Sequence, residues 1–341
     1  MLVVFFHNFG FANYFYFGWL GVDLFFVLSG FLITEILLKT VGQKNYFRNF
    51  YLKRVLRIFP LYYLVLIVSL LILPRIPSLQ DNLHYYVENQ VWLWTYLQNW
   101  LFITKEPEST NFLVHLWSLA VEEQFYLLWP CVILWIRKPK TLLVLVSISL
   151  ILVICLRIWL WLTHTEVLNY FNPYTFTRVD GICIGCMLAL VKAINFDIIK
   201  RYSTLMVLTL SVLNFIFYFL NKNYSFSFPY FPFFGYTSFA IVFAFLIHEA
   251  VTKKNKVINS VFNLHFLKFF GKISYGFYIF HWPIYLGLFP AISLLLSKKL
   301  KWHIQEAQMI SAIIVTLAAV LVSVISYYTF EMKFLKLKNR L

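Results

Sequence analysis

The sequence predicts an all-α protein, a polytopic bundle of about ten transmembrane helices. Of its 341 residues, 61% are hydrophobic and 13% are charged, whereas a soluble domain has about 25% charged residues. The mean hydropathy is +0.75. A span needs about 20 apolar residues, and such runs recur along the chain. The predicted spans are 19–38, 59–74, 114–136, 142–163, 178–192, 203–220, 232–250, 273–296 and 308–330, and 1–9 has the composition of the end of a further one.

Basic residues lie mainly in short segments between these apolar runs. Six of them fall between Lys39 and Arg57, and further groups lie at 137–140, 192–201, 253–272 and 333–340. Because Lys and Arg accumulate on the cytoplasmic side, we expect these segments and both termini in the cytoplasm, with the protein in the inner or plasma membrane. The net charge of +15 is therefore attributed to membrane topology plus one candidate anion site, and no nucleic-acid partner is expected.

Two regions need a separate interpretation. Residues 75–112 are polar and include an aromatic segment, Val91–Ile103. A full span there would put the next basic segment outside, so this segment is predicted to be interfacial or re-entrant. Lys298, Lys299 and Lys301 depart from the charge pattern.

Glu122 and Glu123 stand together in a run of apolar and aromatic residues. Each carboxylate at membrane depth costs about 3 kcal/mol even on a lenient insertion scale, and each disfavours ionisation of the other. Such residues indicate a polar, functional cavity. The alternative is a helix start capped by Ser118, with both carboxylates in the first turn, where the helix dipole favours anions.

Arg54 and Arg57 are three residues apart just before Pro60, so they share one helix face. Two guanidinium groups at a cytoplasmic membrane surface suit a phosphate-bearing ligand. A simple positive-inside anchor would have the same sequence.

His7 is an ionisable residue in an apolar segment, and Asp23 follows in the next run. A histidine oriented by a carboxylate is a common general base, although a lone histidine at membrane depth is more often a core residue. Arg178 and Asp180 open another span. They can pair with each other or bind a polar substrate.

Ser274, Tyr275 and His281 lie within one predicted helix. Seven residues separate the serine from the histidine by about 10 Å, so the two cannot form a hydrogen bond. The four cysteines lie in apolar runs, and the histidines lack ligand spacing, so no metal site is expected.

Five motifs occur in an order that resembles the acyltransferase family 3 membrane proteins. They read GVDLFFVLSGF, YLKRVLRIFPLYY, LWSLAVEEQFYLLWP, TRVDGICIGCMLA and GKISYGFYIFHWP. The resemblance covers essentially the whole chain. It implies an integral-membrane O-acyltransferase that modifies surface polysaccharides, peptidoglycan or lipopolysaccharide O-antigen.

The resemblance also assigns roles to residues. It implies that His7 is the catalytic histidine, which we expect to act as general base or acyl carrier. Asp23 is a candidate orienter from its place in the next apolar run, not from the resemblance. It places Arg54 and Arg57 against an acyl-CoA donor, most often acetyl-CoA. Glu122 and Glu123 would shape a polar cavity or relay a proton. The expected substrate-binding residues are Arg178, Asp180, Ser274, Tyr275 and His281.

The chain departs from the family pattern at both ends. The family has an arginine eleven residues before its histidine, but His7 has six residues before it. The first helix is therefore expected to be truncated. Near the C-terminus the family reads Glu-x-Pro-Phe, whereas this chain has EMKF over Glu331–Phe334. We expect a single membrane domain over 1–341 without a soluble extracellular domain.

The expected activity is transfer of an acyl group, most often acetyl, from acyl-CoA to a hydroxyl of a surface or lipid-linked glycan, with membrane lipids around the helices. A transporter or flippase that moves an acyl group or a lipid-linked sugar is the alternative. It would explain the buried charges equally well but would not require His7 or the arginine pair.

Overall fold

The computed structural model describes residues 1–12, 16–105, 112–163, 174–195, 198–224, 231–252 and 256–338. All regular elements in these residues are helical, which confirms the predicted all-α class. Seven helical stretches among them are long and apolar enough to cross a membrane, so the protein is multi-pass. They are Leu20–Thr40, Tyr46–Arg75, Val114–Ile136, Pro139–Thr163, Phe233–Thr252, His265–Lys299 and Ile304–Lys338.

The other predicted spans correspond to helices that differ in length or apolar extent. Helix α1 (Leu2–Asn8) and helix α10 (Asp180–Ala193) are shorter than a span. Helix α11 (Ile198–Tyr224) is long, but its described apolar stretch covers only Thr204–Phe217. Parts of the predicted basic segments 192–201, 253–272 and 333–340 lie outside the described residues.

Between residues 75 and 105 the chain forms short helices. They are α4 (Pro77–Glu88), α5 (Gln90–Trp94) and α6 (Gln98–Thr104). Each is shorter than the 17 or so residues that a spanning helix requires at minimum. This arrangement agrees with the prediction that the aromatic segment does not cross the membrane as one helix.

Much of the basic segment Lys39–Arg57 is helical and not a loop. Helix α3 runs from Tyr46 to Ile67, so Arg54 and Arg57 lie on a helix that starts well before the apolar run. The side chains of Tyr46 and Phe50, one helical turn apart, are buried. Their burial stabilises the first turns of α3 although polar and charged residues lie among them.

The chain divides into two compact units. Unit 1 comprises Met1–Gly21, Phe47–Trp117 and His265–Leu341, and unit 2 comprises Val22–Tyr46 and Ser118–Leu264. Histidines and arginines named in the sequence analysis fall mainly in unit 1, and the acidic residues fall mainly in unit 2.

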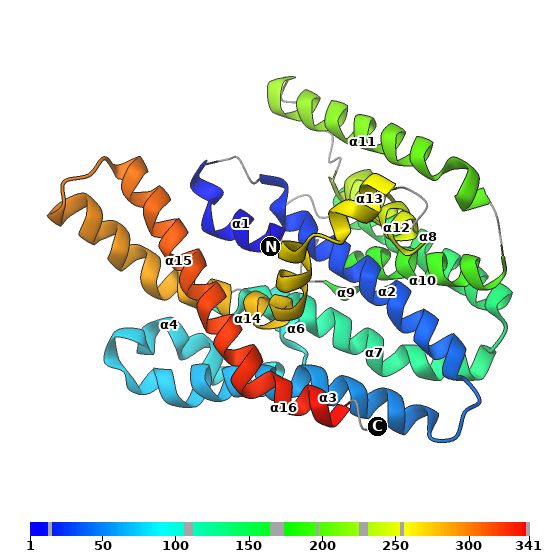
Figure 1. Cartoon of the computed structure of the whole chain (residues 1–341), viewed down its shortest axis with the longest axis horizontal. Coiled ribbons are helices and arrows are strands. Elements are labelled where there is room, and N and C mark those ends of the chain that lie inside the picture. The colour runs from blue at the N-terminus through cyan, green and yellow to red at the C-terminus, as the bar shows by residue number, and fades with distance from the viewer. Residues whose placement is uncertain are drawn as a thin grey trace. The chain divides into compact units, whose positions relative to one another are not determined.

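Unit 1 is built around helices α14 (His265–Leu294) and α15 (Ile304–Ser326), which pack against each other. Helix α15 continues through a π-helical segment, Tyr327–Glu331, into α16 (Met332–Lys338), drawn in red in Figure 1. Helix α1 packs on both through a cluster of Val4, Phe277 and Ala319. These contacts fix α1 although it has only seven residues.

Unit 2 is organised around α10, which packs against the neighbouring helices α8 and α12. Helix α2 also contacts it closely. The helices of unit 2 are α2 (Leu20–Thr40), α7 (Trp117–Ile136), α8 (Pro139–Thr163), α9 (Thr175–Arg178), α10, α11, α12 (Tyr236–Thr252) and α13 (Lys256–Phe262).

Two glycines allow α2 and α10 to approach closely. A Cβ on Gly30 would meet the carbonyl oxygen of Ile182, and a Cβ on Gly185 would meet that of Val27. Small residues permit this kind of backbone contact between membrane helices. The GVDLFFVLSGF and TRVDGICIGC motifs therefore meet along their glycine faces.

Candidate functional site

His7 and His281 lie side by side in unit 1, although 274 positions separate them in the chain. Nδ1 of His7 is 2.9 Å from Nε2 of His281. The ring centroids are 5.1 Å apart and the ring planes differ by 9°. The centroid separation exceeds the nitrogen distance by about two ring radii, so the rings meet end to end, in the plane of the nitrogen lone pairs.

Helix α14 holds His281 in place with the help of Pro283. A proline has no N–H, so it leaves the carbonyl four residues earlier, that of Ile279, without its helical donor. Nε2 of His115 donates to this oxygen at 3.1 Å. In return, the hydroxyl of Tyr278 donates to the carbonyl of His115 at 2.5 Å. These reciprocal bonds fix the helix turn that carries His281.

His7 is positioned from the α1 side. The neighbouring Asn8 donates its amide to the Thr316 hydroxyl of α15 at 2.8 Å, and the His7 ring lies against Trp282, with centroids 4.6 Å apart. His7 is half-buried, whereas His281 is fully buried. The exposed part of the pair is therefore on the His7 side.

A cluster of positive charges lies at another part of unit 1. Arg54 is half-buried, with its guanidinium 5.9 Å from the centre of the Phe50 ring, and Arg57 is exposed. Both lie close enough to Lys338 of α16 to repel its charge, as does Lys53. Gathered cations of this kind are suited to a polyanion such as a chain of phosphates.

Tyr275 links the arginine helix to the histidine helix. Its hydroxyl donates to the carbonyl of Ile58 at 2.7 Å, and Ile58 directly follows Arg57. Tyr275 and His281 are six residues apart on α14, which is about 9 Å along the helix axis. Ser274 is exposed and donates to the carbonyl of Gly271 in its own helix at 3.0 Å, so the structure does not bring it to His281.

Glu331 adds a buried carboxylate to unit 1. It is 8% exposed and accepts a hydrogen bond from the Ser326 hydroxyl at 3.1 Å. Its Oε1 lies against Gly276 on α14, where a Cβ would come within 2.9 Å. The glutamate of the EMKF sequence therefore reaches the same helix as His281.

Glu122 is a buried carboxylate of unit 2. Both the Ser29 and Tyr126 hydroxyls donate to it, and these hydroxyls are 2.9 Å apart. Helix α7 begins at Trp117, so Glu122 and the half-buried Glu123 lie in its second turn. The alternative of a helix start capped by Ser118, with both carboxylates in the first turn, is wrong, because the preceding residues already form a 3₁₀ turn.

Two buried ion pairs form a polar core in unit 2. The guanidinium of Arg178 is 2.6 Å from Asp23, and that of Arg157 is 2.6 Å from Asp180. All four side chains are nearly inaccessible. The predicted alternative that Arg178 pairs with Asp180 is wrong, because each residue is bonded to a partner on a different helix.

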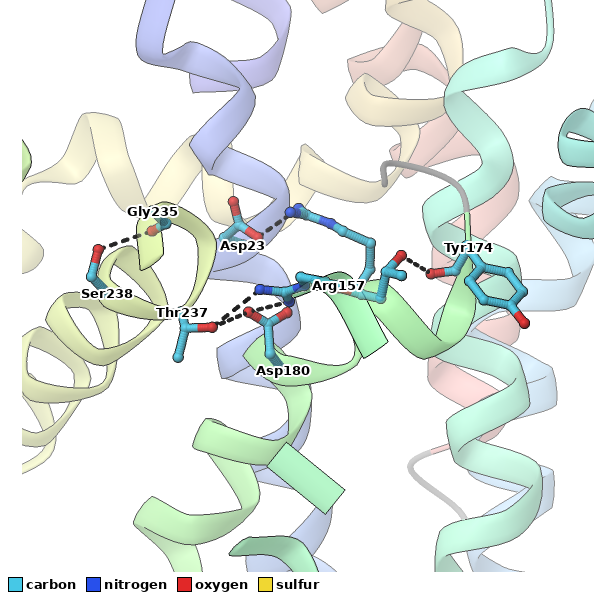
Figure 2. Close-up of polar contacts among 9 residues, drawn as sticks. Asp23, Arg157, Tyr174, Asp180, Gly235, Thr237 and Ser238 are labelled. Atoms are coloured by element: carbon cyan, nitrogen blue, oxygen red, sulfur yellow. Dashed lines mark hydrogen bonds and ion pairs between the residues drawn. The ribbon is translucent and has the colours of Figure 1, made fainter. Parts of the chain in front are cut away.

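Figure 2 shows Arg157, Asp180 and Thr237 converging in this core. The Thr237 hydroxyl donates to Asp180 at 2.9 Å and accepts from Arg157 at 3.2 Å. The Nε of Arg157 donates to the Thr177 carbonyl at 2.6 Å, and the ring of Tyr236 lies 4.0 Å from the Arg178 guanidinium. The core thus connects α2, α8, α10 and α12.

A profile described as an acyltransferase domain, Acyl_transf_3, matches residues 1–328. The chain belongs to acyltransferase family 3. This acyltransferase is 27% identical over 293 residues to the peptidoglycan O-acetyltransferase OatA of Listeria monocytogenes. The alignment covers 81% of this chain and 46% of the relative. It is 30% identical over 286 residues to the O-acetyltransferase OatA of Staphylococcus aureus, covering 78% and 46%.

The acyltransferase spans about half the length of the curated relatives it matches. No solved structure matches it. The family assignment confirms the resemblance drawn from the five motifs. Among the described residues, no group of three His, Cys, Asp or Glu side chains could hold a metal ion.

Sequence reasoning missed two residues that the acyltransferase buries at central points. Arg157 is fully buried in α8, and His115 is 4% exposed beside His281. Arg157 is a lone ionisable residue in an apolar run, and His115 lies in the same apolar run as Glu122 and Glu123. Ionisable residues at membrane depth usually have a functional or structural role, and this rule would have identified both residues.

Proposed function

We propose that this acyltransferase moves an acetyl group from acetyl-CoA to a hydroxyl of a glycan in the cell envelope. Membership of acyltransferase family 3 supports acyl transfer, and the similarity to two O-acetyltransferases supports O-acetylation. Within the molecule, the observation that carries the proposal is the His7–His281 pair, which holds an imidazole at a partly open position of unit 1.

The acetyl donor binds through its phosphates to Arg54 and Arg57. The cations that surround Lys338 support this assignment, because phosphate oxygens accept charge-assisted hydrogen bonds from guanidinium groups. We place this cluster at the cytoplasmic surface, with both termini in the cytoplasm, where acetyl-CoA is made. Tyr275 joins the donor-binding helix to α14, which carries His281.

His7 acts as the general base in the transfer step. The acceptor hydroxyl oxygen attacks the thioester carbonyl carbon while its proton passes to His7. The C–S bond breaks, the acetyl group becomes an ester of the glycan, and the CoA thiolate takes a proton from His7 to leave as a thiol. A two-step route, in which His7 first carries the acetyl group, uses the same residue.

The remaining predicted residues have supporting roles in the proposal. Ser274, Tyr275 and His281 of unit 1 are candidates for shaping the acceptor region. Arg178 and Asp180 of unit 2 are held in buried ion pairs, which supports a structural role for them. Glu122 and Glu123 organise polar groups in unit 2. Asp23 forms an ion pair with Arg178 there. This pairing favours a structural role for Asp23 over a role in orienting His7.

The acceptor is an envelope glycan, and peptidoglycan is the first one to test because it is named in the Listeria relative. The purified protein in lipid nanodiscs would be incubated with labelled acetyl-CoA and peptidoglycan fragments, or lipid-linked polysaccharide including O-antigen. Mass spectrometry should detect an alkali-labile acetyl ester on one acceptor class, together with free CoA.

The transporter alternative predicts a different outcome. The buried charges of unit 2 could equally line a translocation path. In sealed proteoliposomes, a transporter would accumulate label or glycan in the lumen without forming an ester. Failure to form an ester with every acceptor, combined with such accumulation, would overturn the proposed acyl transfer.

A further inference from the structure

We infer that His281 is a positioning residue that fixes the tautomer of His7 and leaves its Nε2 unprotonated, ready to accept a proton. This inference deepens the proposed function and rests on it. It assigns to an imidazole the orienting role that the sequence analysis gave to the carboxylate of Asp23.

The first step concerns Nδ1 of His281, which is 2.6 Å from the carbonyl oxygen of Tyr278. A carbonyl oxygen can only accept a hydrogen bond, so Nδ1 of His281 must carry the proton. The other nitrogen, Nε2, is then an acceptor as long as the ring is neutral.

The surroundings of His281 favour its neutral form. Its side chain is fully buried, and no carboxylate bonds to it among the residues that the structure describes. Two other imidazoles, those of His7 and His115, are its neighbours instead. A buried cation without a counter-ion is strongly unfavourable, so a single proton, on Nδ1, is expected.

The second step follows for His7. Its Nδ1 is 2.9 Å from the accepting Nε2 of His281, so Nδ1 of His7 must donate. In neutral His7 the remaining nitrogen, Nε2, therefore has a free lone pair. When Nε2 takes the proton of the acceptor hydroxyl, the Nδ1–H bond to His281 strengthens because its donor is now charged. An end-to-end arrangement in one plane is what such a bond requires.

The carbonyl of Tyr278 thus fixes one end of a hydrogen-bonded chain of two imidazoles. Its turn of α14 is held by the reciprocal bonds with His115. The order is carbonyl oxygen, His281, His7 and then the reacting hydroxyl, with a histidine in the place that a carboxylate occupies in other hydrogen-bonded triads.

Two variants of His281 separate this role from simple packing. His281→Gln keeps an amide oxygen that can accept from His7, whereas His281→Leu has no acceptor. We expect kcat to fall by about 10²–10⁴-fold in the Leu variant, as for loss of a general base, with an unchanged KM for acetyl-CoA. The Gln variant should stay within about tenfold of the wild type. His84→Gln, at an exposed position of α4, is the matched control.

The tautomer itself can be read by ¹⁵N NMR of histidine-labelled protein in nanodiscs, with the His7 signals identified as those lost in His7→Gln. The wild type and His281→Gln should show a protonated Nδ1 and a bare Nε2 on His7, and His281→Leu a mixture of tautomers. A protonated Nε2 in the wild type, or one unchanged tautomer in all variants, would overturn the inference. An active His7→Gln enzyme would instead overturn the proposed function and leave the NMR result standing.

Discussion

The guanidinium of Arg178 lies 2.6 Å from the carboxylate of Asp23, although 155 positions separate these residues in the chain. Both side chains are buried, and the neighbouring Arg157–Asp180 pair is buried as well. Because each pair joins one positive and one negative side chain, the two ion pairs leave the polar core of unit 2 electrically neutral. Such a core tolerates burial only while every charge keeps its partner.

Asp23→Asn should therefore destabilise the protein strongly. Loss of one partner leaves the other charge buried without compensation, which costs about 3–5 kcal/mol. Thermal unfolding in detergent would measure the effect as a lower Tm and a smaller yield of folded protein. The matched change Glu35→Gln removes two ion pairs, to the exposed Lys39 and Lys192, each expected to contribute about 0–1 kcal/mol. Equal Tm values for the two variants would contradict the buried-pair interpretation.

Gly185→Ala should destabilise unit 2, whereas Gly287→Ala should not. A Cβ at Gly185 meets the Val27 carbonyl, but one at Gly287 meets nothing within 4 Å. Both positions are inside helices, so helix propensity favours alanine equally, by up to about 1 kcal/mol. Overpacking at Gly185, which typically costs about 1–3 kcal/mol before this gain is subtracted, should outweigh it. Melting curves of the two variants, measured side by side, should shift in opposite directions.

The sequence was sufficient to predict helices and their order, since each depends on a local run of apolar residues. It was not sufficient to predict which charges pair. Arg178 and Asp180 are two positions apart, but residues two apart on a helical backbone do not face each other, so each finds a partner on another helix. The His7–His281 pair likewise depends on how α1 packs on α14, which no local pattern encodes.

Arg54→Ala and Arg57→Ala should raise the KM for acetyl-CoA. Each variant loses a charge-assisted contact to phosphate, worth about 1.5–3 kcal/mol, which corresponds to roughly 10- to 150-fold in affinity. Steady-state kinetics at saturating acceptor would measure this. Arg48→Ala, an exposed arginine earlier on α3, is the control and should change KM by less than about twofold. The same small change in the Arg54 and Arg57 variants would remove them from the donor site.

Gln43 lies in the exposed turn between α2 and α3 and should face the cytoplasm, because the basic residues around it follow the positive-inside rule. In a background without the four native cysteines, Gln43→Cys should resist a membrane-impermeant thiol reagent in intact cells. The same variant should label readily once the cells are permeabilised, which serves as the control. Full labelling in intact cells would reverse the topology and place the arginine pair outside.

His7→Gln should abolish glycan acetylation while the protein still inserts in the membrane and still binds acetyl-CoA. Glutamine keeps a side chain able to form hydrogen bonds but cannot take a proton near pH 7, so the loss should reach about 10²–10⁴-fold. The measurement is alkali-released acetate from envelope glycan in strains with matched expression, together with acetyl-CoA binding to the purified variant. His303→Gln, at an exposed position before α15, should retain normal acetate. If His7 only packed against His281 and Trp282, the glutamine variant would keep most of its activity, and acetate near the wild-type level would exclude His7 as the base.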